Sequence, residues 1–469
     1  MPVGPTLRRI AEAAGLGLVF AAVYSLSPLY RSTQNTYFLH GLAACGEGFL
    51  ADDWLATTAD PTPAFTWLVE WTCRYPGSWF FHVWSVAFFA LYCVGLVGLA
   101  VAIFKLESRP SALPLFVTLL LVLHSIPARF VSLRTLGIDV PQLLHVGLAT
   151  QWALSPKLSP SVCGLLFVPA AWLYLRGNWL VAVALTSLAA AMHPTYLLPS
   201  AIFTLAWAVE AIRCREPLSR VGAFVTVAAL LSLPTAAYVA STFPAASAPI
   251  HEGAQRLLVE EIIPHHALPG TWSRAQTSLQ LSVLLLALWL TRGTRLFGIL
   301  ATSSVVALAL SVVAVACGNR TLLLAFPWRI SVVLIPIASA MVQAALIHRV
   351  TDRWSTSLSR HRSLTLATCG AVAFAVMLGG IYKMREERRL DAALPDREVM
   401  AFAKGAVRRG DVWLVPVSAS PRDVELFRDF RLNSGVPLVA DSQSHPYRDD
   451  ELLAWDERVR QIRRLYLGP

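Results

Sequence analysis

Residues 81–104 read FHVWSVAFFALYCVGLVGLAVAIF, a run without Asp, Glu, Lys or Arg. A helix of this length and composition is long enough to cross the hydrocarbon core of a bilayer. A second uncharged, apolar run occupies residues 296–317. Because water is a poor solvent for either run, the sequence predicts that both segments are transmembrane helices.

The composition of the whole chain agrees with a membrane protein. Of its 469 residues, 55% are hydrophobic and 14% are charged, and the mean hydropathy is +0.55. Soluble domains are about one quarter charged. The formal net charge is +10, but most of the excess lies in short connections, where Lys and Arg set membrane orientation. We therefore expect that the protein does not bind nucleic acid. We predict that its partner is the lipid bilayer.

The apolar runs predict an all-α polytopic membrane protein of about eleven transmembrane helices. They are expected at residues 10–30, 79–104, 112–128, 160–175, 178–192, 195–212, 221–240, 278–291, 295–317, 329–348 and 364–382. Positive charge in the short connections places the N-terminus inside. Four longer segments then lie outside, and we name them the first loop (31–78), the second loop (129–159), the third loop (241–277) and the tail (383–469). A basic cluster at residues 383–389 follows the last span on the predicted outer side, against the positive-inside rule.

Residues 61–75 of the first loop have the pattern of an amphipathic helix. Phe65, Leu68, Val69 and Thr72 recur at helical spacing, which predicts one buried face. The same loop contains Cys45 and Cys73, two of seven cysteines in the chain. If the loop lies in an oxidising compartment, these two can form a disulfide.

The tail has the composition of a soluble domain. Residues 411–417 and 436–441 have the pattern of strands, and residues 450–467 that of a helix, so we expect a small extracytoplasmic α/β domain after a membrane domain of residues 1–382. Such a tail is too short for a large core of its own, which predicts that it docks on the loops. Segments 427–431 and 445–447 are candidates for that contact.

Asp52 and Asp53 are the first candidates for chemistry, because they interrupt an apolar stretch just beyond the first span. Neighbouring residues on a helix point about 100° apart, which suggests separate roles. One acid can accept a proton from a substrate hydroxyl, and the other can bind a divalent cation. The alternative is that the pair only caps the helix that follows.

Several basic and polar residues are further candidates for substrate binding. His265 and His266 lie in a loop bounded by prolines, and His265 is also a candidate metal ligand together with Asp53. His193 precedes a proline at the end of a span, and Arg329 opens another span, where it can bind phosphate. Each also has a structural alternative. His193 can be a hydrogen-bonded residue in a helix kink, and Arg329 can extend its charged group to the membrane interface. Weaker candidates in the second loop are Arg134, Gln151 and Lys157.

The topology and the acidic pair resemble the GT-C class of membrane glycosyltransferases. This resemblance implies transfer of a sugar from a polyprenyl-phosphate donor on the outer face of the bacterial cytoplasmic membrane. It implies that Asp52 or Asp53 is the general base or a ligand of Mg²⁺ or Mn²⁺, and that Arg329 binds the donor phosphate. Residues 34–41 (QNTYFLHG) and Pro264-His265-His266 are also similar to an uncharacterised family of bacterial membrane proteins.

Two other classes of function remain open. A transporter or flippase would need ionisable residues inside the spans, and few are present. A non-catalytic scaffold would use the tail to bind a partner and would have no cavity around the acidic pair. Walker A, HExxH and GxSxG motifs are absent, so the sequence does not support ATP-driven transport or serine hydrolase chemistry.

Overall fold

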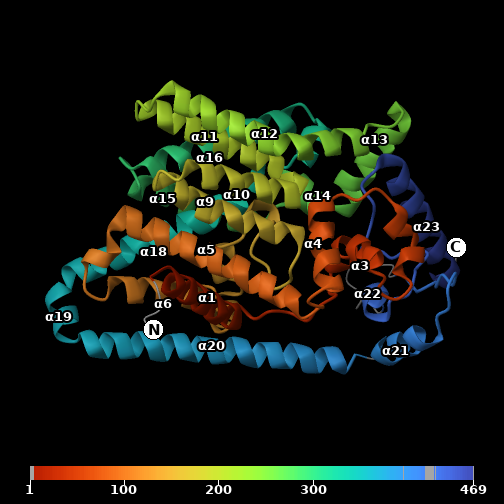
Figure 1. Cartoon of the computed structure of the whole chain (residues 1–469), viewed down its shortest axis with the longest axis horizontal. Coiled ribbons are helices and arrows are strands. Elements are labelled where there is room, and N and C mark those ends of the chain that lie inside the picture. Colours follow the sequence, from red (N-terminus) through yellow and green to blue (C-terminus); the bar gives the residue numbers. More distant parts are fainter. Residues whose placement is uncertain (1–4, 395, 418–426, 428, 468–469) are drawn as a thin grey trace.

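The computed structural model describes residues 5–394, 396–417, 427 and 429–467. Helices dominate this part of the chain, and most run along one direction in a layered bundle (Figure 1). The helices of this bundle are α1 (Pro5–Tyr24), α5 (Phe80–Phe104), α6 (Ala112–Leu123), α7 (Ile126–Leu136), α9 (Phe167–Leu175), α10 (Trp179–Met192), α11 (Leu197–Arg213), α12 (Leu218–Thr242), α15 (Arg274–Leu290), α16 (Arg295–Ala316), α18 (Ser331–Arg353) and α20 (Arg362–Ala392).

Each of the eleven predicted spans coincides with a helical segment, but fewer are long enough to cross a bilayer alone. Within the described residues, six helical segments are sufficiently long and apolar, or seven if the bent pair α6 and α7 forms one span. The segments 160–175 and 179–192 are apolar but short. The chain is therefore an all-α membrane protein, while the count of eleven full crossings is not supported by helix length.

Helix α18 lies at the centre of the bundle and is buried along most of its length. It packs between α15, α6 and α5, and its side chains join one apolar core that includes Phe20, Tyr92 and Leu96. Helix α12 is mostly exposed despite its apolar sequence. An apolar, exposed helix face is expected where lipid replaces water as the solvent.

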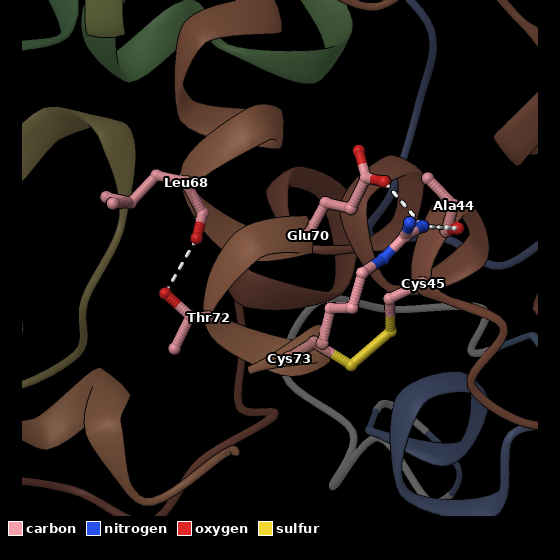
Figure 2. The surroundings of a disulfide bond; sticks show 7 residues. Ala44, Cys45, Leu68, Glu70, Thr72 and Cys73 are labelled. Carbon is pink, nitrogen blue, oxygen red and sulfur yellow. Dashed lines mark hydrogen bonds and ion pairs between the residues drawn. A yellow bond between two sulfur atoms is a disulfide. The ribbon is translucent and has the colours of Figure 1, made fainter. Parts of the chain in front are cut away.

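The first loop folds as a helical hairpin. Its helices α3 (Leu39–Cys45) and α4 (Pro63–Arg74) are joined by the disulfide between Cys45 and Cys73 (Figure 2). The predicted amphipathic helix is confirmed, because α4 buries Phe65, Leu68, Val69 and Thr72. The Arg74 guanidinium donates to the Ala44 carbonyl oxygen at 3.0 Å and to Glu70 at 2.7 Å. The disulfide and the contact between Arg74 and Ala44 both join α4 to α3.

The α/β character expected of the tail is wrong for the residues that the structure describes. Segments 411–417 and 436–441 do lie side by side, but they form only one isolated parallel bridge, between Trp413 and Leu438. The Trp413 amide donates to the Pro437 carbonyl, and the Val439 amide donates to the Trp413 carbonyl. The described tail is otherwise built from helices α21 (Asp396–Ala406), α22 (Phe430–Ser434) and α23 (Asp449–Leu467).

The tail lies at the same end of the bundle as the first loop. Helix α20 runs along one edge of the molecule and leads to α21, which packs against α22 (Figure 1). Asp429 accepts from the Ser32 amide and the Asn35 side chain, and α23 packs against α13 (Ala248–Arg256) of the third loop. The tail therefore docks on the loops, as its size predicts, and the segments around residues 429–431 and 445–447 make part of the contact.

Candidate functional site

A cavity of about 610 Å³ lies where the membrane helices meet the loops and the tail. Its lining combines polar groups with an apolar wall. The lining residues are Ser32, Thr33, Thr36, Tyr37, Pro61, Gln151, Ser161, His193, Pro194, Thr195, Val239, Phe243, Leu258, Ile262, Ile263, His265, His266, Phe326, Arg329, Ser442, Gln443, His445 and Tyr447. We call it the large lobe.

A second cavity of about 430 Å³ adjoins the large lobe, and we call it the small lobe. It extends along the second loop past Trp152, Ser155 and Lys157. The two lobes share seven lining residues, which are Ser32, Thr33, Gln151, Ser161, His265, His266 and Arg329. The lobes are therefore two parts of one site that meet around Arg329.

Arg329 is positioned by a break in the chain before α18. Phe326 adopts a left-handed backbone with φ of 49°, and Pro327 then begins a 3-10 turn, Pro327–Ile330, that continues into α18. A non-glycine residue with positive φ is uncommon and is frequent near functional sites. The break turns the Arg329 side chain into the cavity at the N-terminal end of a long helix, where the backbone dipole also favours an anion.

The Arg329 guanidinium is 8% exposed and has few partners. Its Nη2 donates to Ser161 Oγ at 3.1 Å, and its central carbon lies 4.9 Å from the centre of the Tyr196 ring. In the described part of the chain it forms no ion pair with a carboxylate, and its Nε has no hydrogen-bond acceptor. A buried cation normally has an anionic partner, so this arrangement is suited to an anionic ligand.

Other buried polar atoms around the cavity also have no hydrogen-bond partner among the described residues. They are Gln151 Oε1, His193 Nδ1, Thr195 Oγ1 and His445 Nδ1. Buried polar atoms are almost always hydrogen-bonded to protein or water in folded proteins. Their concentration around one cavity makes it a polar site in which a ligand or water would complete these hydrogen bonds.

His265 and His266 follow a π-helical segment, Leu257–Ile262, and Pro264. Single π-helical turns are frequently found at functional sites. His266 Nδ1 lies 2.9 Å from the Ala149 carbonyl oxygen. A carbonyl can only accept, so Nδ1 carries the proton and Nε2 keeps a free lone pair. Burial lowers the pKa of His266 to about 4, so the ring is neutral near pH 7.

A hydroxyl pair lies at the junction of the first loop and the tail. Tyr37 and Tyr447 have hydroxyl oxygens 2.9 Å apart, and the Tyr37 ring lies 5.7 Å from the His193 ring. His193 reaches this point because α10 ends at Met192 and Pro194 begins a new turn. Burial raises the pKa of both tyrosines, so both hydroxyls keep their protons.

Neither predicted acid lines the cavity. Asp53 is fully buried, and its Oδ2 accepts from Arg431 Nε and from the Leu438 amide, both at 2.8 Å. Its Oδ1 accepts from the Leu55 amide, so Asp53 also caps the 3-10 turn Trp54–Thr57. Asp52 is exposed, and its nearest described partner is the Gly410 amide at 3.4 Å. The acids expected to act as base and metal ligand instead hold the tail against the first loop.

The expected metal site does not assemble either. Asp53 has its oxygen atoms occupied by the tail and the capped turn, while His265 lies at the cavity. Within the described residues, no group of three or more His, Cys, Asp or Glu side chains is arranged to hold a metal ion. Arg134 is also separate from the site, because it is exposed on α7 and does not line either lobe.

The lining of the two lobes contains no Asp or Glu in the part of the chain that the structure describes. Its charged members are Arg329 and Lys157. Of the sequence candidates, the structure brings together Arg329, His193, His265, His266 and Gln151. Sequence reasoning placed the stretch 156–161, which includes Ser161, in the second loop and noted the stretches 34–41 and 445–447. It assigned no ligand contact to Tyr37 or His445, because neither carries a motif for a specific chemistry.

Comparison with known proteins gives little information about activity. A family described as "Domain of unknown function (DUF6798)" matches residues 395–462. The match lies entirely within the tail. No curated protein and no solved structure matches the chain.

Proposed function

We propose that this protein binds a polyprenyl-phosphate-linked sugar in the two-lobed cavity and transfers the sugar to an acceptor. The observation that carries the proposal is Arg329, a buried cation without a carboxylate partner in a lining that contains no described acid. Arginine binds phosphate through parallel, charge-assisted hydrogen bonds. A phosphate at this position would supply the negative charge that the buried guanidinium lacks.

The apolar wall of the large lobe supports a lipid-linked ligand over a free sugar phosphate. Val239 and Phe243 come from the end of α12, and Leu258, Ile262 and Ile263 come from the third loop. Burial of isoprenoid carbon on such a wall is favourable at about 25 cal/mol per Å². Since α12 is exposed along most of its apolar length, a prenyl chain can approach the cavity along it from the bilayer.

The lining of the small lobe is suited to hold polar reactants. Trp152, Ser155 and Ser159 line it, together with the residues shared around Arg329. Sugars combine a weakly apolar ring face with hydroxyl groups, so indole and hydroxyl side chains are suitable contacts. The phosphate would then lie at the junction of the lobes, with the lipid on one side and the polar reactants on the other.

The transfer step can proceed with the groups around the junction. The acceptor oxygen bonds to the anomeric carbon, and the bond from that carbon to the phosphate oxygen breaks with its electron pair passing to the phosphate. Arg329 stabilises the charge that develops on the phosphate. His266 Nε2 takes the acceptor proton, because that nitrogen carries the free lone pair. Bound phosphate raises the low pKa of this ring and so makes it a stronger base.

The disulfide supports an extracytoplasmic location of the site. Disulfides persist in oxidising compartments and are rare in the cytosol. Cys45 and Cys73 lie in the first loop, which packs against the tail and contributes Tyr37 to the cavity. The proposed location is thus the bacterial cytoplasmic membrane, with the cavity open to the outer side.

A binding measurement on the purified full-length protein tests the proposal. Farnesyl phosphate is the probe, and isothermal titration in detergent measures its affinity. We expect the Arg329→Gln variant to bind the probe at least about tenfold more weakly, since a charged hydrogen bond contributes about 1.5–3 kcal/mol. Arg134→Gln is the matched control, because Arg134 is exposed away from the cavity, and it should bind as the wild type does.

The transfer step is tested separately with His266→Gln. This variant should bind farnesyl phosphate normally and lose sugar transfer from membrane lipid extracts. Equal binding by the wild type and Arg329→Gln would overturn the proposed phosphate site. Normal binding with no transfer to any acceptor by the wild type would favour a transporter or flippase of the same lipid.

A further inference from the structure

The segment that matches the domain of unknown function contributes directly to the cavity. Ser442, Gln443, His445 and Tyr447 of the tail line the large lobe beside residues of the first and third loops. These four side chains carry hydroxyl, amide and imidazole groups, with no fixed charge. The tail therefore supplies neutral hydrogen-bonding groups to a site whose cationic group, Arg329, comes from the membrane domain.

A buried ion cluster holds this part of the tail in position. Arg431 is 2% exposed and forms ion pairs with Asp53 of the first loop and Asp441 of the tail. Asp441 Oδ1 in turn accepts from the backbone amides of Gln443 and Ser444. The start of the cavity-lining segment is thus tied to the first loop through two carboxylates and one guanidinium.

His445 lines the large lobe and packs against two aromatic rings of the tail. It is 8% exposed, and its ring lies 5.0 Å from that of Tyr447 and 5.8 Å from that of Trp455. Its Nδ1 has no hydrogen-bond partner among the described residues. Trp455 is itself fixed by donation from Nε1 to the Asp441 carbonyl oxygen. His445 is thus a buried residue of the cavity lining, and a neutral imidazole can both donate and accept a hydrogen bond.

Tyr447 can contribute a second hydrogen bond. In the pair of hydroxyls formed with Tyr37, one oxygen donates and the other accepts. The hydroxyl that accepts keeps its own hydrogen for another acceptor. The hydroxyl pair therefore keeps one hydrogen for a ligand, on Tyr37 or on Tyr447, and both residues line the large lobe together with His445.

We infer that the tail is the head-group recognition element of the site, and that His445 and Tyr447 bind hydroxyl groups of the sugar on the lipid-linked donor. This inference rests on the proposed function. Neutral imidazole and phenol groups form hydrogen bonds with hydroxyls, whereas the phosphate is already matched by Arg329. The tail residues therefore determine which sugar is bound, and Arg329 determines that a phosphate is bound.

The test compares probes with and without a sugar on the full-length protein in detergent. Farnesyl phosphate is the reference, and farnesyl phosphate esters of glucose, mannose, galactose and arabinose are the sugar probes. We expect the wild type to bind at least one sugar probe about fivefold more tightly than farnesyl phosphate, as one or two neutral hydrogen bonds would provide. His445→Ala should remove this preference and leave farnesyl phosphate binding within about a factor of two.

The matched control is His251→Ala. His251 also contacts the tail, through Nδ1 and Asp449 at 2.8 Å, but it does not line the large lobe. The His251→Ala variant should therefore bind the sugar probe more tightly than farnesyl phosphate, as the wild type does. Tyr447→Phe keeps the ring and its packing and should reduce the preference if His445→Ala does not fold.

Three results would overturn the inference. The first is equal binding of all probes by the wild type, and the second is an unchanged sugar preference in both tail variants. The third is an affinity of His445→Ala that falls by the same factor for farnesyl phosphate and for the sugar probes. This result would show that His445 only shapes the cavity. If the wild type binds no probe at all, the proposed function fails together with the inference, whereas the first three results leave phosphate binding at Arg329 intact.

Discussion

The buried ion pair of Asp53 with Arg431 gives the acidic pair a testable structural role. Breaking a buried pair from one side leaves an uncompensated charge and costs about 3–5 kcal/mol. We expect Asp53→Asn to lower the free energy of unfolding by about 3 kcal/mol, and Asp52→Asn to change it by less than about 0.5 kcal/mol because Asp52 is exposed. Thermal unfolding of the purified variants in detergent measures both.

The same variants show whether Asp53 holds the tail in place or takes part in the reaction. If Asp53 only holds the tail, any residual folded Asp53→Asn protein should keep the proposed sugar transfer. Unchanged thermal stability together with complete loss of transfer would instead assign chemistry to Asp53.

The buried histidines predict how stability depends on pH. Burial lowers the pKa values of His266 and His445 to about 4, against about 6.5 in an unfolded chain. Between these values the unfolded chain binds more protons than the folded protein. The free energy of unfolding should therefore fall as the pH drops from about 6.5 to about 4, by at most about 1.4 kcal/mol per histidine for each pH unit.

Thermal unfolding over this pH range checks the histidine prediction. His445→Gln removes one of the titrating groups, so its stability should depend less steeply on pH than that of the wild type. Parallel curves for the two proteins would show that His445 does not titrate in this way.

At the scale of elements, the helical hairpin of the first loop depends on its disulfide. Cys45 and Cys73 join α3 to α4 across 28 residues, and a crosslink of this span stabilises a fold by about 3 kcal/mol. The double variant Cys45→Ser, Cys73→Ser should therefore show faster amide hydrogen exchange in α3 and α4, measured by mass spectrometry. Cys317→Ser is the control, because Cys317 is an exposed free cysteine. Equal exchange in the double variant and the wild type would contradict the prediction.

Several elements follow from local pattern alone. Apolar periodicity identified the amphipathic helix α4 together with its buried face, and it located the helices of the membrane domain. It failed for the tail, where residues 411–417 and 436–441 have the alternation of strands but share a single bridge. A strand needs neighbours to satisfy its backbone, and these segments instead use contacts such as the Leu438 amide donating to Asp53.

At the scale of the whole molecule, the loops and the tail are predicted to share one side of the membrane. Cys317 follows α16 and precedes Arg320, which pairs with Glu260 of the third loop. Ser357 lies in α19 (Ser355–Arg360), at the opposite end of the bundle from the tail (Figure 1). A membrane-impermeant maleimide added to intact spheroplasts should label Cys317. In a Cys317→Ser background, Ser357→Cys should react only after the membrane is permeabilised. Labelling of both positions in intact cells would contradict this arrangement.

The sequence by itself determined the properties that depend on neighbours along the chain. These are the membrane class, the helices, the amphipathic face of α4 and a set of polar residues at span ends, of which Arg329, His193, His265, His266 and Gln151 do line one cavity. Each of these rests on periodicity, on composition or on a break such as Pro194, and such signals are local.

Only the tertiary structure decided which residues share a site. Ser161, Arg329 and Tyr447 are far apart in the sequence, and their meeting depends on how the loops and the tail pack. The same packing buried Asp53 against Arg431 and so removed it from the cavity. A carboxylate has the same chemistry in both settings, but its role is decided by the charge that lies beside it, and that neighbour is 378 residues away in the chain.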